Sequence, residues 1–134
     1  MQLDPTAYLE AVEAEMQAVV RPPRGSQAPL YGMLQYHLGW VTADGRPAHG
    51  ARGKRLRPLL CLLACDAVGG DWRRAVPAAA AIELTHNFSL IHDDIEDKSP
   101  TRHGRPTIRK LWGTAQGINA GDALWSLARL AIHR

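Results

Sequence analysis

The chain has 134 residues, which is enough for one domain or for part of one. Leu and Ala together number 36 and Val and Ile only 12, so the composition favours helices over strands. The contents of 46% hydrophobic and 22% charged residues exclude a disordered chain, and the net charge of +3 permits contacts with phosphates without demonstrating them.

The first residues lack the features of a secretory signal. Met-Gln-Leu-Asp-Pro has neither a basic start nor an apolar core, and the apolar runs at 59–64 and 75–82 are shorter than the ~20 residues that cross a bilayer. Cys61 and Cys65 lie four residues apart, a spacing that fits neither a zinc knuckle nor a redox pair. We therefore expect a cytoplasmic, soluble protein with reduced thiols and no membrane span.

Helical patterns alternate with helix breakers along the chain. Asp4 followed by Pro5 is typical of a helix start, and apolar residues recur at helical spacing from there to Val20. Further helices are predicted over residues 30–40, 55–68, 72–97, from 107, and from 114 towards 134, with loops at 42–53 and 98–106. Pro77 predicts a kink or a late start in the fourth helix. The nearly continuous apolar run at 76–91 indicates that this helix is central and buried.

Acidic residues gather at the end of this fourth helix. Asp93 and Asp97 lie one turn apart on one face, with Asp94 beside them. Like charges ~5–6 Å apart repel by roughly 3 kcal/mol per pair, and the helix dipole adds to the repulsion. A bound cation would relieve it, and ligand sets of oxygen alone suit Mg²⁺. The alternative is a solvated helix end that the following basic residues neutralise.

Basic residues in two other segments are candidates for binding phosphates. Lys54 and Arg57 share a face at the start of the third predicted helix, where the backbone N–H groups also favour anions. Arg55 points elsewhere and is interpreted as a solvated surface charge. His86, two turns before Asp93 on the same face, is either a ligand or a satisfied core residue. The loop after the acids adds Arg102, His103 and Arg105.

These motifs together resemble the trans-isoprenyl diphosphate synthases, the polyprenyl synthetase family. The matches are Gly53-Lys-Arg-Leu-Arg-Pro58, the segment from Glu83 to Asp97 with its DDxxD pattern, Ser99-Pro-Thr-Arg102, Gly104-Arg-Pro-Thr107 and Asn119-Ala-Gly-Asp-Ala-Leu124. The resemblance implies an all-α helical bundle of the isoprenoid-synthase type. Residues 1–134 are then expected to be the N-terminal part of a single polyprenyl synthetase domain.

The resemblance also implies roles for the charged residues in condensing an allylic diphosphate with isopentenyl diphosphate. Asp93 and Asp97 are expected to bind Mg²⁺ on the allylic diphosphate, with Asp94 as a supporting catalytic residue. The residues expected to bind the two diphosphates are Arg102 for the allylic substrate, and Lys54, Arg57, His86 and His103 for isopentenyl diphosphate.

Two departures from the family pattern affect these expectations. His103 stands where the family usually has a second Arg, and it carries a full charge only when protonated. The resemblance ends before the second aspartate-rich motif of the family and covers less than half of a typical synthase. We therefore expect the chain to be inactive by itself. Because the family is dimeric, and Gly117, Ala120 and Gly121 would allow close helix packing, a homodimer is expected.

The length of the product is predicted from the residues before the acids. Phe88 lies five residues before Asp93, and the small Ser89 follows it. In the family, bulk at this place closes the floor of the cavity. The pattern resembles synthases with products of medium length, geranylgeranyl or farnesyl diphosphate, although Phe88 could equally be a core residue.

Alternative functions stay open at this point. A non-catalytic or regulatory synthase-like subunit that pairs with a full-length partner fits the missing C-terminal motif but leaves the intact acids without a purpose. A metal phosphohydrolase of the HD type would use His92 and Asp93, but it leaves residues 53–58 unexplained. The basic residues are too scattered to form a nucleic-acid-binding face.

Overall fold

The computed structural model describes residues 3–23, 28–49 and 53–134. Its elements are α1 (Pro5–Val19), α2 (Ala28–His37), α3 (Leu56–Ala67), the 3-10 helix η1 (Trp72–Ala75), α4 (Val76–Glu96), β1 (Thr101–Arg102), β2 (Arg105–Pro106), α5 (Ile108–Trp112) and α6 (Thr114–Ala131). The predicted all-α class is confirmed, and each predicted helix is present close to its expected bounds. Of the predicted loop at 42–53, residues 50–52 lie outside the described residues.

Helix α1 begins where the sequence predicts. Asp4 Oδ1 accepts a hydrogen bond from the backbone N–H of Ala7 at 3.1 Å, and a proline opens the helix. Tyr8, Val12 and Met16 recur every four residues and are buried, so they form one apolar stripe. This stripe packs α1 against α3, α4 and α6.

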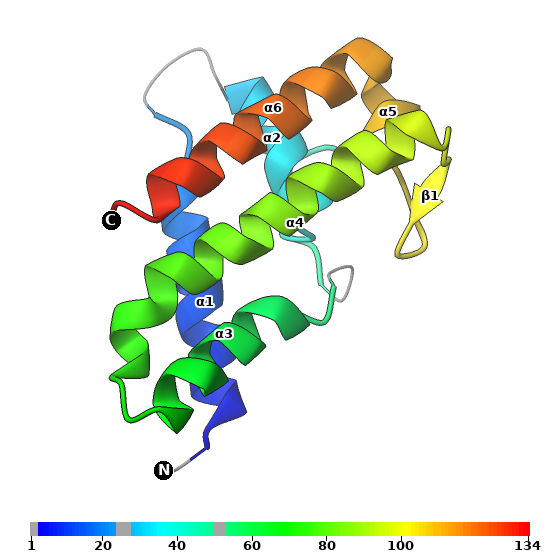
Figure 1. The fold of residues 1–134 in the computed structure, drawn as a ribbon. Coiled ribbons are helices and arrows are strands. Elements are labelled where there is room, and N and C mark those ends of the chain that lie inside the picture. Colours follow the sequence, from blue (N-terminus) through cyan, green and yellow to red (C-terminus); the bar gives the residue numbers. More distant parts are fainter. Residues whose placement is uncertain (1–2, 24–27, 50–52) are drawn as a thin grey trace.

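Helix α4 is the central element of the molecule. It starts at Val76 after η1 and carries Pro77 in its first turn, so the predicted late start is confirmed. It contacts α1, α3, α5 and α6, and Figure 1 shows it running through the middle of the ribbon. The prediction that this helix is buried all round is wrong on one side, because Ile82 and Thr85 are exposed. The neighbouring helices cover only part of its circumference.

Helices α4 and α6 run antiparallel and side by side (Figure 1). Their approach depends on small residues of α6. A Cβ atom on Gly117 would lie 2.8 Å from Ile95 Cδ1, and one on Gly121 would meet the ring of His92. Ala120, which lies between these glycines, is fully buried. The close helix packing that the sequence predicts at Gly117, Ala120 and Gly121 is therefore with α4 of the same chain, so these residues give no support to a homodimer.

Residues 98–106 were predicted to be a loop, but they include a short hairpin. Strands β1 and β2 pair antiparallel, and His103 (φ 51°) and Gly104 (φ 73°) form the turn. Positive φ at both turn residues matches the twist of a two-residue hairpin, and glycine adopts it without strain. Thr107 Oγ1 accepts from the N–H of Lys110 and donates to Ser99 O at 2.9 Å. These bonds fasten the base of the hairpin, which projects Arg102 and His103 from one end of α4.

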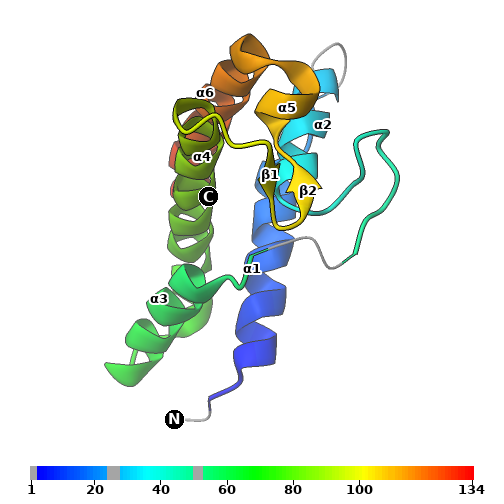
Figure 2. The same ribbon diagram turned by 90° about the vertical axis from the view of Figure 1, so that its right-hand side faces the viewer.

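The core lies between α1 and the α4–α6 pair, which Figure 2 shows on opposite sides of the molecule. The core includes Leu34 on α2, Leu38 directly after α2, Leu62 on α3 and Leu84 on α4, which are all at most 1% exposed. Other large apolar side chains remain exposed, among them Leu56 and Leu60 on α3 and Ile118, Trp125 and Leu130 on α6. Within the described ranges, no helix combines the length and the apolar content that spanning a membrane requires.

Candidate functional site

A cleft of about 530 Å³ opens where the start of α3, the middle of α4 and the hairpin meet. Its walls include all of the residues that the sequence analysis assigned to the binding of diphosphates: Lys54, Arg57, His86, Arg102 and His103. These residues come from three segments that are separated by up to 49 positions in the chain. The tertiary structure therefore gathers cationic and hydrogen-bonding groups that suit an anion with several oxygen atoms.

Arg57 and His86 are in direct contact across this cleft. Arg57 Nη1 lies 3.2 Å from His86 Nε2. Because a guanidinium can only donate, Nε2 of the imidazole accepts and its proton is on Nδ1. Partial burial, reinforced by the positive charge of Arg57, lowers the pKa of His86 below its ordinary value. His86 is thus neutral at neutral pH, and it presents one N–H donor.

Arg102 is oriented by the buried carboxylate of Asp94. Arg102 Nε lies 3.0 and 3.2 Å from the two oxygens of Asp94, and Nη2 lies 2.8 Å from Oδ1. This hydrogen bonding raises the pKa of Arg102 further. Asp94 is 3% exposed, so it points into the protein, whereas Nη1 of Arg102 makes no hydrogen bond to any described residue. Asp94 therefore holds an arginine whose remaining donors are available to a ligand.

Asp93 and Asp97 differ from Asp94 in both exposure and contacts. Both are exposed, they lie one helical turn apart, and neither carboxylate has a hydrogen bond or ion pair with the described residues. The described residues contain no group of three or more His, Cys, Asp or Glu side chains that could enclose a metal ion. Mg²⁺ commonly uses only one or two carboxylates and completes its octahedron with water and phosphate oxygens. Two free, adjacent carboxylates fit that requirement.

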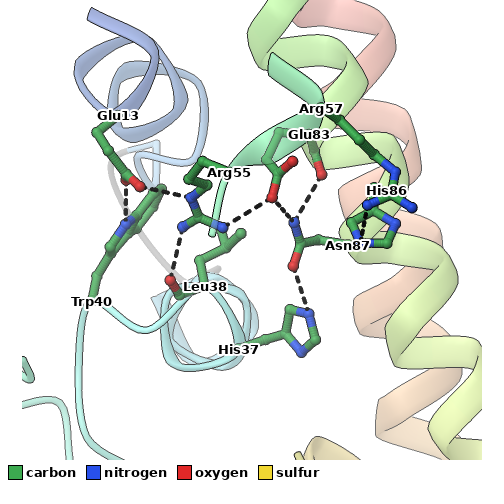
Figure 3. A network of polar contacts seen from close by, with 9 residues as sticks. All are labelled: Glu13, His37, Leu38, Trp40, Arg55, Arg57, Glu83, His86 and Asn87. Atoms are coloured by element: carbon green, nitrogen blue, oxygen red, sulfur yellow. Dashed lines mark hydrogen bonds and ion pairs between the residues drawn. The ribbon is translucent and has the colours of Figure 1, made fainter. Parts of the chain in front are cut away.

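The prediction that Arg55 is a solvated surface charge is wrong. Its side chain is 5% exposed, and Nε lies 2.7 Å from Glu13 Oε1 of α1. Nη1 lies 3.2 Å from Glu83 Oε1 of α4, and Nη2 donates to Leu38 O at 3.1 Å (Figure 3). Helical periodicity did place Arg55 on a different face from Arg57. It could not reveal that α1 and α4 supply carboxylates to that face.

The network continues along α4 to a histidine of α2. The amide of Asn87 donates to Glu83 O at 2.8 Å and to Glu83 Oε1 at 3.1 Å, and its oxygen lies 3.0 Å from His37 Nε2 (Figure 3). Desolvation, together with the nearby charges of Arg102 and Arg55, lowers the pKa of His37 to about 3. Sequence analysis did not single out Glu83, Asn87 or His37. The sequence did hold one indication of a buried polar network: Glu83 and Asn87 lie four residues apart within the apolar run at 76–91.

Phe88 and Ser89 do not belong to the walls of the cleft. The ring of Phe88 packs edge-on against His92 of its own helix and Trp125 of α6, with centroids 5.7 and 6.4 Å apart. Arg129 in turn stacks over the ring of Trp125 at 3.5 Å. Phe88 therefore lies between α4 and α6 and not among the basic residues of the cleft.

Comparisons with known proteins agree with this arrangement. A family model described as Polyprenyl synthetase matches residues 40–134. The chain is 48% identical over 96 residues to a (2E,6E)-farnesyl diphosphate synthase of Mycobacterium tuberculosis, covering 72% of this chain and 27% of the relative. It is 54% identical over 123 residues to a geranylgeranyl diphosphate synthase of Methanosarcina mazei, covering 92% and 33%. The chain thus spans about a third or less of these relatives.

The solved structure of a polyprenyl synthetase from Streptomyces coelicolor has the same fold over this region. It superposes with a TM-score of 0.80 and 41% sequence identity, over 96% of this chain and 38% of that one. The geranylgeranyl pyrophosphate synthetase of Pyrococcus horikoshii gives a TM-score of 0.80 at 36% identity. The predicted bundle type is therefore confirmed.

The lowered pKa of His37 predicts that acid destabilises the protein. Between pH 6.5 and 3 the unfolded chain binds a proton on His37 that the folded chain does not bind. The free energy of unfolding should therefore fall as the pH falls below 6.5, by up to about 1.4 kcal/mol per pH unit from this group. Urea unfolding at pH 7, 6 and 5 should show a shallower decline for His37→Gln than for the wild type. The exposed His133 supplies a control, His133→Gln, and equal slopes in all three proteins would contradict the prediction.

Proposed function

Because the chain belongs to the polyprenyl synthetase family, we propose that it forms the diphosphate-binding face of a prenyltransferase. The substrates are an allylic diphosphate and isopentenyl diphosphate, and the product is a polyprenyl diphosphate of medium length, like geranylgeranyl or farnesyl diphosphate. The observation that carries this proposal is one cleft that unites basic residues of three segments, near two carboxylates that have no partner in the described part of the chain.

Each side of the cleft has its own role in the proposal. Lys54, Arg57, His86 and His103 hold the diphosphate of isopentenyl diphosphate, and Arg102 donates to that of the allylic substrate. Asp93 and Asp97 hold Mg²⁺, which when bound supplies positive charge that stabilises the leaving diphosphate. Asp94 contributes by keeping Arg102 in place.

In the proposed reaction the protein forms no covalent bond with the substrates. The allylic C–O bond breaks, the double bond of isopentenyl diphosphate attacks the allylic cation, and a proton leaves the new product, with the departing diphosphate as its acceptor. Arg102 and Arg57 keep both diphosphates oriented so that the reacting carbons meet. Apolar side chains of α4 shelter the cation from water.

The assembly and location that we propose follow the family. The complete enzyme is a cytoplasmic homodimer without a nucleic-acid partner. Support for an interface comes from Ile118 and Trp125, which are exposed on α6 seven residues apart and so share one helix face. The α6 surface therefore offers an apolar stripe to a second helix.

The proposed magnesium site is tested by replacing both exposed carboxylates. Binding of an allylic thiodiphosphate, measured by calorimetry, should tighten when Mg²⁺ is added to the wild type. In Asp93→Asn/Asp97→Asn this gain should fall by tenfold or more, because the ligand charge is lost while the size is kept. Glu96→Gln, a neighbouring exposed acid, is the matched control and should retain the gain. An undiminished gain in the double variant would refute the magnesium role.

The chain alone is proposed to bind substrates without turning them over. Its described residues provide one acidic cluster and one partly open cleft, and the chain spans about a third or less of its relatives. A steady-state condensation assay with isopentenyl and farnesyl diphosphates should give no turnover above background. Robust product formation by the 134 residues would overturn this part of the proposal.

The proposed role of Phe88 concerns the length of the product. In a complete synthase that carries this segment, Phe88→Ala should remove the bulk beside Ser89 and allow longer products. Chromatography of the products should show this shift, whereas Ile82→Ala, an exposed position on the same helix, should leave the distribution unchanged. If Phe88→Ala only lowers the melting temperature, its packing on Trp125 is its whole role.

A further inference from the structure

Arg55 stands between Lys54 and Arg57 in the chain, and its buried side chain also borders the cleft. It is the last residue before α3, and its backbone is in the left-handed region with φ 54°. Non-glycine residues rarely adopt this conformation, so the surroundings must hold it in place. The side chain is bonded to Glu13 of α1, to Leu38 O after α2 and to Glu83 of α4. One guanidinium thus joins four parts of the chain at the start of the phosphate-binding segment.

Glu83 is the carboxylate of this network that matters to an anion. It is 3% exposed, it is part of the cleft wall, and it lies one turn before His86 on α4. A carboxylate here would repel a diphosphate, because a buried charge is only weakly screened by solvent. Its ion pair with Arg55 Nη1, at 3.2 Å, places a compensating positive charge beside it. Figure 3 shows Glu83 between Arg55 and the pair of Arg57 and His86.

From these contacts we infer that Arg55 is a positioning residue of the diphosphate cleft, which fixes the Lys54–Arg57 segment against α4 and compensates the charge of Glu83. All three of its nitrogens are bonded to protein atoms, namely Glu13, Leu38 O and Glu83, so we assign it to positioning rather than to contact with the ligand. This inference rests on the proposed function, since it assumes that Lys54, Arg57 and His86 bind a diphosphate. The inference adds that diphosphate binding also depends on Arg55, a residue other than those proposed to contact the ligand.

The test is calorimetric titration of the 134-residue chain with inorganic diphosphate in the absence of Mg²⁺, so that the acidic cluster takes no part. Arg55→Met should weaken binding roughly tenfold, because Glu83 loses its cation and the segment its anchor. Adding Glu83→Gln to Arg55→Met should recover at least threefold of that loss. A purely structural role predicts that any recovery of binding only follows a recovery of the melting temperature, because the second substitution also removes an unpaired buried charge.

Two further variants distinguish a failure of the inference about Arg55 from a failure of the proposed diphosphate cleft. Arg57→Met removes a ligand-contacting group, and it should weaken binding whatever Arg55 does. Leu124→Ala removes fully buried packing on α6, which contributes no residue to the cleft wall, and it should lower the melting temperature while leaving diphosphate binding unchanged. If Arg55→Met does not fold, Arg55→Lys replaces it, because lysine keeps the charge but cannot bridge three partners.

The outcomes decide between the two claims. If Arg55→Met folds, weaker binding in this variant together with recovery in the double variant supports the inference. If it does not fold, weaker binding in Arg55→Lys at an unchanged melting temperature supports it. Unchanged binding in the Arg55 variant together with weaker binding in Arg57→Met overturns the inference and leaves the proposed function intact. Absence of recovery, or an equal loss in Leu124→Ala, also overturns it. Unchanged binding in Arg57→Met refutes the proposed cleft itself.

Discussion

The buried guanidinium of Arg55 is the constraint on which the geometry of the cleft depends. Removing a charge from water is costly unless partners satisfy it, and here three elements must meet around one side chain to do so. Glu13, Leu38 O and Glu83 come from α1, from the segment after α2 and from α4. Because α3 starts at the next residue, the same contacts determine where α3 leaves the core.

The acidic cluster shows how neighbouring residues of one type acquire opposite roles. Asp93 and Asp94 are adjacent, but successive helical residues differ by about 100° in direction. Asp94 therefore points into the protein and holds Arg102, while Asp93 and Asp97 remain exposed and unpaired among the described residues. Arg102 thereby compensates the negative charge of Asp94 and reduces the repulsion within the cluster. The other two carboxylates are left without such a partner among the described residues.

The hairpin contributes to the site because it returns the chain towards α4. Positive φ at His103 and Gly104 reverses the chain within two residues, and Thr107 bonds to Ser99 O at its base. Arg105 strengthens this placement from the other strand: it donates to Tyr36 O and to Val41 O, and it stacks on the ring of Tyr36. Arg102 and His103 are thus held by contacts with α2 as well as by the turn itself.

The helices and the residues of the candidate site could be predicted from the sequence, because both predictions depend on local spacing. Asp4 and Pro5, the glycines of α6 and the recurrence of Asp93 and Asp97 act within one or two turns of a helix, so a pattern can reveal them. The burial of Arg55 and the pairing of β1 with β2 in the segment after α4 became visible only in the folded chain. Those outcomes depend on partners such as Glu13, which is 42 positions away from Arg55, and no local pattern specifies which distant carboxylate a side chain will meet.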